Sequence, residues 1–155
     1  MAEIKTILIF EMLGRPIEHL KSTFEQFVDK ISKEEGFNVC SRKIHEPKRI
    51  ESSKQELFTT FAELEINFKD FLNFSKAILF YMPSHVEIIS PEEIQIKNFD
   101  LNSVSNELIS RLHQYDEIAK RLIMEKNISQ AQIQKLQNLA EKPAGKKADK
   151  KRKKS

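Results

Sequence analysis

The stretch from Glu56 to Phe68, which reads ELFTTFAELEINF, constrains the fold more than any other part of the chain. From Phe58 onward every second residue is apolar or small, whereas Glu63 and Glu65 fall between them. Because successive side chains of an extended strand point to opposite faces of a sheet, one face of this segment is expected to be buried and the other half polar. Its aromatic and β-branched residues suit a strand, so we predict a central strand on which other apolar segments pack.

Two segments near the N-terminus extend this picture. The segment from Ile4 to Leu13 has apolar residues at both parities, which predicts a second central strand with cover on each face. From Pro16 to Glu35 apolar residues recur at spacings of three and four, which is typical of an amphipathic helix. Gly36 is expected to end this helix in a left-handed conformation.

The remaining elements complete an order of strand, helix, strand, strand, helix, strand. We predict an edge strand at Phe37 to Ile44, a polar loop at His45 to Gln55, a helix at Lys69 to Phe80 and a strand at His85 to Ser90. This order is that of the ferredoxin-like βαββαβ fold of the α+β class, with one antiparallel sheet, its first and third strands central, and both helices on one face. Residues 1–98 are therefore expected to form one α+β domain.

A helical extension is predicted for residues 99–140. Four residues, Leu101, Leu108, Tyr115 and Leu122, lie seven apart and resemble a coiled-coil seam, although Arg111 and Glu125 interrupt the partner positions. Both this stripe and the open face of the sheet would expose apolar surface if left alone. We therefore expect the extension to pack on the open sheet face, in its own chain or in a dimer mate.

The extension is expected to break near Asn127. Ser129 and Gln132 match a capping box there, and Ile128 with Ile133 matches a hydrophobic staple. These signals predict that a separate last helix begins near this point and runs to about Leu139.

The positive charge of the chain is concentrated at its C-terminus. Of the 26 Lys and Arg residues, eight lie in Glu141–Ser155 beside two acids, so this segment carries +6 and the rest of the chain −3. Residues 141–155 lack apolar periodicity and are expected to be disordered. The predicted nucleic-acid-binding residues are Lys146, Lys147, Lys150, Lys151, Arg152, Lys153 and Lys154, which would contact phosphates through counterion release. A purely solubilising tail is the alternative.

Signals for catalysis, metal or cofactor binding are weak. The histidines His19, His45, His85 and His113 lack the spacing of a metal-binding pair. Cys40 lies on a predicted strand beside apolar Phe37 and Val39 rather than at a helix start, so a structural role is expected. We expect no catalytic residue, no metal and no cofactor. No apolar run approaches the length of a membrane span, so we expect a cytoplasmic protein without a membrane partner.

Two weaker sites stay open as alternatives. Gly14 and Arg15 lie at a strand-to-helix junction, where a helix N-terminus can hold an anion. Glu11, Glu63 and Glu65 are expected to share the open sheet face, where they would bind a metal or share a proton. For the three carboxylates we favour a solvated face, or ion pairs with Arg and Lys of the long helix.

The segments ELFTTFAELEINF and YMPSHVEIISPEEIQI resemble those of a group of small archaeal proteins of unassigned function, over roughly Ile4 to Leu122. The predicted topology also resembles that of ACT-type regulatory domains. Such domains bind amino acids near the first strand-to-helix loop and usually pair, so this resemblance implies a ligand at Gly14 and Arg15.

These expectations favour a non-enzymatic binding or adaptor protein. Its body would contact a protein partner or form a homodimer, and its tail would hold RNA or DNA weakly. An ACT-like small-molecule sensor is the alternative, and an enzyme that uses the acidic sheet face is a third reading.

Overall fold

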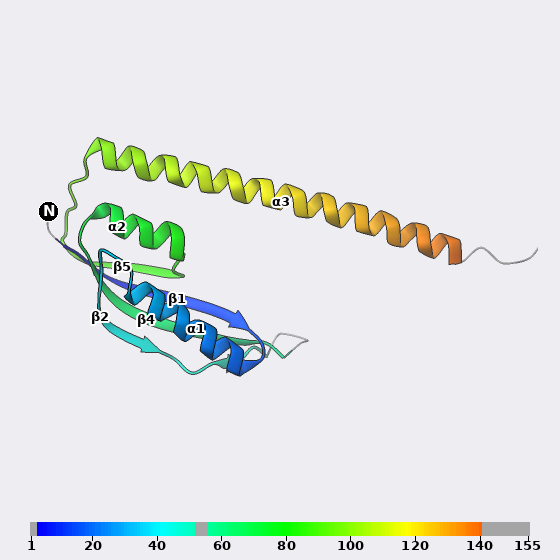
Figure 1. The fold of residues 1–155 in the computed structure, drawn as a ribbon, viewed down its shortest axis with the longest axis horizontal. Helices are drawn as coiled ribbons and strands as arrows, with labels where there is room; N and C mark the ends of the chain where they lie inside the picture. The colour runs from blue at the N-terminus through cyan, green and yellow to red at the C-terminus, as the bar shows by residue number, and fades with distance from the viewer. Residues whose placement is uncertain (1–2, 52–55, 141–155) are drawn as a thin grey trace, which may run out of the picture. The chain divides into compact units, whose positions relative to one another are not determined.

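The computed structural model describes residues 3–51 and 56–140. They form an α+β fold with a five-stranded antiparallel sheet, two shorter helices and a long C-terminal helix (Figure 1). The α+β class and the C-terminal helical extension are thereby confirmed. The chain divides into two compact units, Met1–Leu108 and Ile109–Ser155, and the division falls within the long helix.

The sheet has the strand order β2-β4-β1-β5, and a short strand β3 also pairs with β4. The strands are β1 (Ile4–Gly14), β2 (Phe37–Ile44), β3 (Lys48–Arg49), β4 (Phe58–Phe68) and β5 (His85–Ser90). All of these pairings are antiparallel, and β1 and β4 run side by side from Ile4 opposite Phe68 to Gly14 opposite Phe58. The two segments predicted to be central strands therefore lie inside the sheet.

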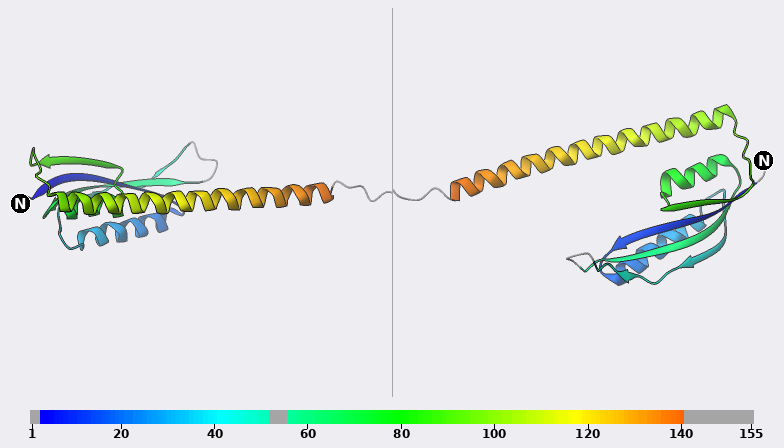
Figure 2. Two further views of the ribbon diagram at one scale, coloured as in Figure 1. Left: turned by 90° about the horizontal axis from the view of Figure 1, so that it is seen from above. Right: turned by 180° about the vertical axis from the view of Figure 1, so that it is seen from behind.

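The core lies on one face of this sheet. In β4 the buried residues are Thr60, Ala62, Leu64, Ile66 and Phe68, and in β1 they are Ile4, Thr6, Leu8 and Phe10. The predicted alternation of β4 is confirmed, because the residues between the buried ones are half-buried or exposed. Helix α1 (Ile17–Ser32) covers the buried face with Leu20, Phe24, Val28 and Ile31 (Figure 2).

Helix α2 (Phe71–Lys76) differs from the predicted helix Lys69–Phe80, because it continues as the π-helical turn η1 (Ala77–Tyr81). A π turn places one extra residue in the helix. Here the ring of Tyr81 lies 6.0 Å from the ring of Phe27 and 6.0 Å from that of Phe37. The chain then leaves the helix through Met82, which adopts a left-handed conformation with φ 49°.

The predicted left-handed conformation of Gly36 is confirmed, with φ 85°. The same residue needs to be small, because a Cβ atom there would lie 2.4 Å from the Asn73 side chain. Gly36 therefore lets the turn between α1 and β2 approach α2 closely.

Two sequence-based predictions were wrong. The expected polar loop contains β3, whose Lys48 and Arg49 pair with Thr59 and Phe58 of β4. They do so because β2 ends at Ile44, which leaves this end of β4 unpaired on the side away from β1. Residues 52–55 of that loop lie outside the described part of the chain.

The second error is the expected break near Asn127. Helix α3 is continuous from Asn98 to Ala140. It contains neither Gly nor Pro, and a single Asn or Ser inside a helix costs only about 0.5–0.7 kcal/mol relative to Ala. Local capping signals were therefore too weak to interrupt it.

Two further predictions remain untested. The packing of the long helix on the open sheet face, in its own chain or in a dimer mate, stays a prediction. The expected disorder of Glu141–Ser155 and the seven basic residues between Lys146 and Lys154 lie outside the described residues.

Candidate functional site

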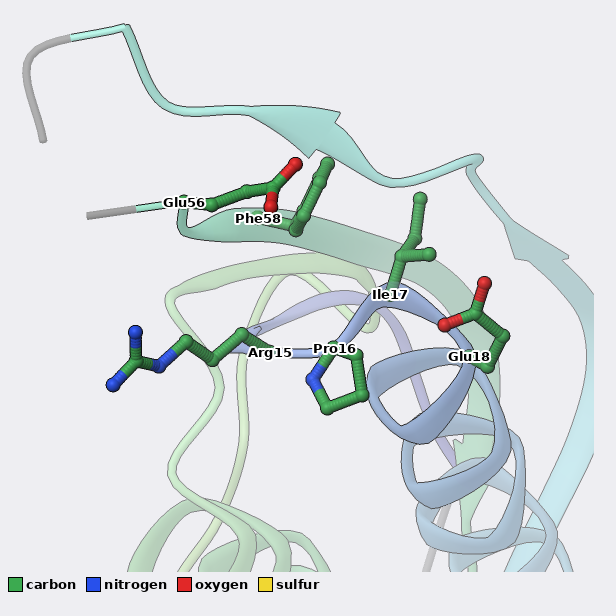
Figure 3. A pocket seen from close by; sticks show the side chains of 6 residues that line it. All are labelled: Arg15, Pro16, Ile17, Glu18, Glu56 and Phe58. Carbon is green, nitrogen blue, oxygen red and sulfur yellow. The ribbon is translucent and has the colours of Figure 1, made fainter.

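A pocket of about 530 Å³ lies where β1 passes into α1. Its lining residues are Arg15, Pro16, Ile17, Glu18, Glu56 and Phe58 (Figure 3). Of the two residues predicted to bind a ligand, Arg15 lines this pocket and Gly14 lies next to it in the chain. The predicted ligand loop therefore coincides with a concave surface.

The local sequence explains why the pocket forms at this turn. Pro16 is the N-cap residue of α1 with φ −67°, which suits the fixed ring of proline, and its carbonyl accepts a bond of 3.1 Å from the Leu20 N–H. A Cβ atom at Gly14 would lie 3.3 Å from Leu20 Cδ1. The role of Gly14 shown by these contacts is close packing of β1 on α1, and the charged side chains come from its neighbours.

The pocket combines opposite charges with an apolar floor. Arg15 supplies a guanidinium group, and Glu18 and Glu56 supply carboxylates. Figure 3 shows Arg15 extending to the opposite side of Pro16 from Glu18, with Ile17 and Phe58 between the charged groups. The lining therefore offers a cation to an anionic group of a ligand and carboxylates to a cationic group.

The open face of the sheet does not gather its carboxylates into a metal site. Glu11 Oε1 accepts a hydrogen bond of 2.9 Å from Thr59 Oγ1, and Glu63 Oε1 lies 2.9 Å from His45 Nε2. Among residues 3–51 and 56–140 there is no group of three His, Cys, Asp or Glu residues that could hold a metal ion. The partner of Glu63 is His45, rather than the expected Arg or Lys of the long helix.

His45 is fixed by several contacts that the sequence reasoning missed. The His45 ring stacks on the Phe61 ring with centroids 4.0 Å apart. The backbone N–H of His45 donates to the Phe61 carbonyl at 2.9 Å, and the backbone carbonyl of His45 accepts from Thr60 Oγ1 at 2.6 Å. The strand register would have revealed this group, because Ile44 opposite Ala62 places His45 beside Phe61. These hydrogen bonds extend the pairing of β2 with β4 by one residue beyond Ile44.

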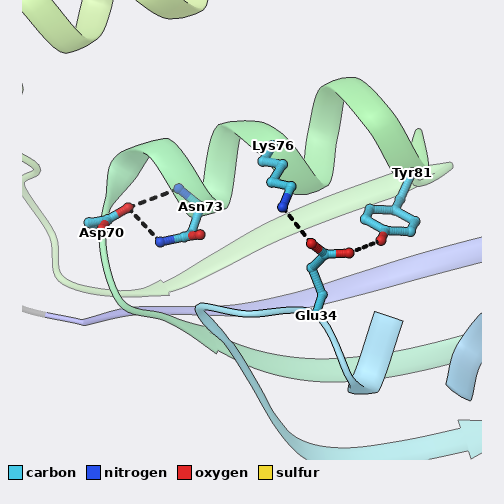
Figure 4. Close-up of polar contacts among 5 residues, drawn as sticks. All are labelled: Glu34, Asp70, Asn73, Lys76 and Tyr81. Atoms are coloured by element: carbon cyan, nitrogen blue, oxygen red, sulfur yellow. Dashed lines mark hydrogen bonds and ion pairs between the residues drawn. The ribbon is translucent and has the colours of Figure 1, made fainter. Parts of the chain in front are cut away.

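A second polar cluster ties the turn after α1 to α2 (Figure 4). Glu34 accepts hydrogen bonds from Lys76 Nζ and from the Tyr81 hydroxyl. The hydrogen bond from Lys76 lowers the pKa of Glu34 most, and the hydrogen bond from Tyr81 lowers it further. Burial, reinforced by the bond to Glu34, raises the pKa of Tyr81 to about 12. Near neutral pH this cluster is therefore an ion pair with a neutral phenol, which suits a structural clamp.

Helix α3 carries the largest set of exposed apolar side chains. They include Leu101, Leu108, Leu112, Tyr115, Ile118, Leu122, Ile133, Leu136 and Leu139. Every residue from Leu112 to Leu139 is exposed. Within the described part of the chain, none of the helices combines the length and apolar character that crossing a membrane requires. Among the described residues, exposed apolar side chains are therefore most numerous on α3.

Comparison with known proteins places the chain beside one family. The model of a family described as the MJ0538 family matches residues 5–145, which is consistent with the predicted resemblance to small archaeal proteins. No curated protein and no solved structure matches the chain.

Proposed function

The chain belongs to the MJ0538 family, and from this premise we propose that it is a non-enzymatic binding protein whose α3 contacts protein and whose basic tail contacts nucleic acid. The observation that supports this proposal best is the exposure of apolar side chains along α3. Leu101, Leu112 and Leu122 are 48%, 57% and 57% exposed. Contiguous apolar surface of this kind marks protein interaction sites.

The strand order supports a finer assignment of the first unit. We propose that it is a ferredoxin-like domain, because β1 and β4 are flanked by β2 and β5 in an antiparallel sheet, with α1 and α2 packed against one core. In such a domain the opposite sheet face is open, and half-buried Ile7, Ile9 and Phe61 lie on that face here. A binding role for the body follows from these two apolar surfaces together.

The tail supplies the nucleic-acid part of the proposal. It follows α3 directly in sequence and concentrates a charge of +6 in residues 141–155. Contacts between lysines and phosphates release counterions, so binding of this kind weakens steeply with salt and has little sequence preference.

Hydrogen exchange on the full chain tests the protein-contact role of α3. If a protein surface covers residues 101–122, their amides exchange more slowly than those of a peptide spanning residues 98–140. Exchange at the rate of the isolated peptide would contradict the proposal for α3. The amides of β1 and β4 provide an internal reference for a fully packed region.

Charge replacement tests the tail. A variant in which Lys146, Lys147, Lys150, Lys151, Arg152, Lys153 and Lys154 are all replaced by Gln keeps the length of the tail. Fluorescence anisotropy with single-stranded RNA should show weaker affinity and a flatter dependence on salt, by up to about 0.7 in slope for each phosphate that the tail no longer neutralises. Unchanged affinity and slope would contradict nucleic-acid binding through the tail. Replacing Lys120 and Lys126 of α3 by Gln serves as the control.

The pocket at the β1–α1 turn supports a second candidate, a small-molecule sensor that takes an amino acid or a similar zwitterion. Its specific support is the placement of Arg15 opposite Glu18 around Ile17 and Phe58. Titration calorimetry with a panel of amino acids should detect heat with the native chain and little with Arg15→Gln. Equal binding by both proteins, or no binding by the native chain, would contradict this candidate. Lys33→Gln, at an exposed position after α1, is the matched control.

A further inference from the structure

We propose that α3 pairs in antiparallel orientation with α3 of a second copy of this chain, over residues 101–125. This inference rests on the proposed protein-binding role of α3 and names its partner. Two sets of residues recur at intervals of seven along one side of the helix. The first seam set is Leu101, Leu108, Tyr115 and Leu122, and the second seam set, three residues further on, is Val104, Arg111, Ile118 and Glu125.

Both sets lie along one side of α3, where Val104 and Arg111 are half-buried and Val104 lines a hollow beside Leu72 and Phe80 of its own chain. Leu108, Ile118 and Leu122 are 44%, 44% and 57% exposed. They belong to one continuous helix without Gly or Pro. Side chains at these two positions of a seven-residue repeat face the partner in a two-stranded coiled coil. The covered surface would thus be mostly apolar.

The two charged seam residues exclude a parallel pair. In a parallel coiled coil in register, each residue faces its own counterpart. Arg111 would then face Arg111 of the other copy, and Glu125 would face Glu125. Two like-charged pairs inside one seam are unfavourable because each charge loses water without gaining a counterion.

An antiparallel pair removes both conflicts. In that orientation the first seam set of one helix faces the second seam set of the other. With the twofold axis at the level of residue 113, Leu108 faces Ile118 of the second copy and Leu122 faces Val104, each contact occurring twice. Leu101 faces Glu125 at the two ends of the paired segment, where the carboxylate can stay in contact with water. Arg111 then lies against the ring of Tyr115, where a guanidinium group can stack on an aromatic face.

The residues that flank the seam agree with the same register. Glu107 faces Arg121 of the second copy on both sides of the axis, and Leu112 faces Leu112 across it. Opposite charges at flanking positions favour a given partner orientation. Glu107, Arg111 and Tyr115 already make interactions within the single chain, so pairing adds to or exchanges those contacts and does not depend on their absence.

A register shifted toward the C-terminus is less complementary. If the axis lay at the level of residue 120, Leu108 would face Gln132 and Tyr115 would face Glu125. Arg121 would also face Arg121 across the axis. Of the two registers, the one with its axis at residue 113 therefore pairs the segment from Leu101 to Glu125 with itself better. This self-complementarity identifies a second copy of the chain as the partner.

Single cysteines in the full chain test the arrangement. Cys40 is exposed and is first replaced by Ser. Gln114→Cys lies next to the proposed axis, so mild oxidation should link two chains through it. His113→Cys lies at the level of the axis on the side of the helix away from the seam and is the control; its yield of linked dimer should be several-fold lower. Equal yields from both positions would overturn the proposal.

A second cysteine position separates the orientations. Leu122→Cys should not link to itself in an antiparallel pair, because it faces Val104, but it should link to Val104→Cys when the two variants are mixed. Efficient self-linking of Leu122→Cys would show a parallel pair and overturn the proposal.

Light scattering separates failure of this inference from failure of the proposed function. The native chain should have twice the 18.1 kDa mass of one chain. A single-chain mass together with slow exchange in residues 101–122 would show that α3 is covered by its own chain. That result overturns pairing and leaves the protein-contact role of α3 intact, whereas a single-chain mass with fast exchange overturns both.

Discussion

The central strands and α3 both carry a regular apolar pattern, but they differ in how far the chain itself buries it. Leu8 of β1 and Leu64 of β4 are completely buried, whereas Leu108 and Leu122 of α3 are 44% and 57% exposed. A hydrophobic period predicts the type of an element in both cases. Burial additionally requires a complementary surface, which α1 and α2 provide for the sheet. The difference leaves α3 as the region whose apolar side chains the described part of the chain does not bury.

The largest expected effect separates the two regions directly. Leu64→Ala removes a fully buried side chain and should lower the free energy of unfolding of the first unit by about 2–5 kcal/mol. Leu136→Ala, at a residue 66% exposed on α3, should change it by no more than about 0.5 kcal/mol. Urea unfolding followed by circular dichroism measures both. Similar losses for the two variants would erase the contrast between the regions.

A second substitution sharpens the account of the core side. Gly36→Ala forces a left-handed backbone on a residue with a Cβ atom and brings that atom to 2.4 Å from Asn73. We expect a loss of about 1–3 kcal/mol. Gly14→Ala is the matched control, since its added Cβ meets only the flexible end of Leu20 at 3.3 Å. Thermal unfolding of the two variants decides between them, and a larger loss at Gly14 would contradict this reading.

The clamp at Glu34 predicts a dependence on pH that α3 should not share. The folded pKa of Glu34 is lower than its ordinary value of 4.5, so its stabilising contribution is complete above that pH and is lost as the pH falls through the folded value. Glu34→Gln should cost about 1–3 kcal/mol near neutral pH. The difference from the native chain should shrink in acid, and pH-dependent unfolding measures it. A constant difference down to acid pH would show that the carboxylate charge is not involved.

The Tyr81 end of the clamp has the opposite sign. Its folded pKa of about 12 exceeds the ordinary value of 10, so its contribution is present below pH 10 and is lost as the pH rises through about 12. In Glu34→Gln the pKa of Tyr81 should move down part of the way, because burial, the larger cause, remains. Titration of tyrosinate absorbance, with Tyr81→Phe to identify the signal, checks this. A Tyr81 pKa unchanged by Glu34→Gln would contradict the hydrogen bond between these two side chains.

The smallest effect concerns the continuity of α3, and its sign carries the information. Inside an unbroken helix, Ser129→Ala should raise helix stability by about 0.5 kcal/mol, because Ala has the higher helix propensity. If Ser129 capped a separate helix, the same change would instead cost about 1 kcal/mol. Circular dichroism of the full chain during mild heating measures the sign. Ser105→Ala, at a residue whose hydroxyl bonds the Leu101 carbonyl, is the control inside the helix.

The sequence was sufficient where one physical signal dominated. The alternation of β4 predicted its buried residues because a slip of one position would turn every apolar side chain to the wrong face. The positive φ of Gly36 was predictable from its place after an amphipathic helix. The turn at Arg15 was also identified. Its neighbours Glu56 and Phe58 come from a segment far away in the sequence, at the start of β4, and were not.

The predictions from sequence were wrong where the local energy differences between two structures were small. They were incomplete where segments far apart in the sequence meet. The capping signal at Ser129 did not interrupt α3, because a single Ser inside a helix costs only about 0.5 kcal/mol relative to Ala. The π turn before Met82 depends on how Tyr81 fits between Phe27, Phe37 and Glu34, which no local pattern encodes. The contact of His45 with Glu63 required the strand register to be known beforehand.

The uninterrupted course of α3 has a mechanical consequence. Forty-three residues at 1.5 Å each make a rod about 65 Å long, without a glycine or proline at which it could hinge. Unwinding of the helix under load is therefore expected to start at its ends, near Asn98 and Ala140, rather than at an internal weak point.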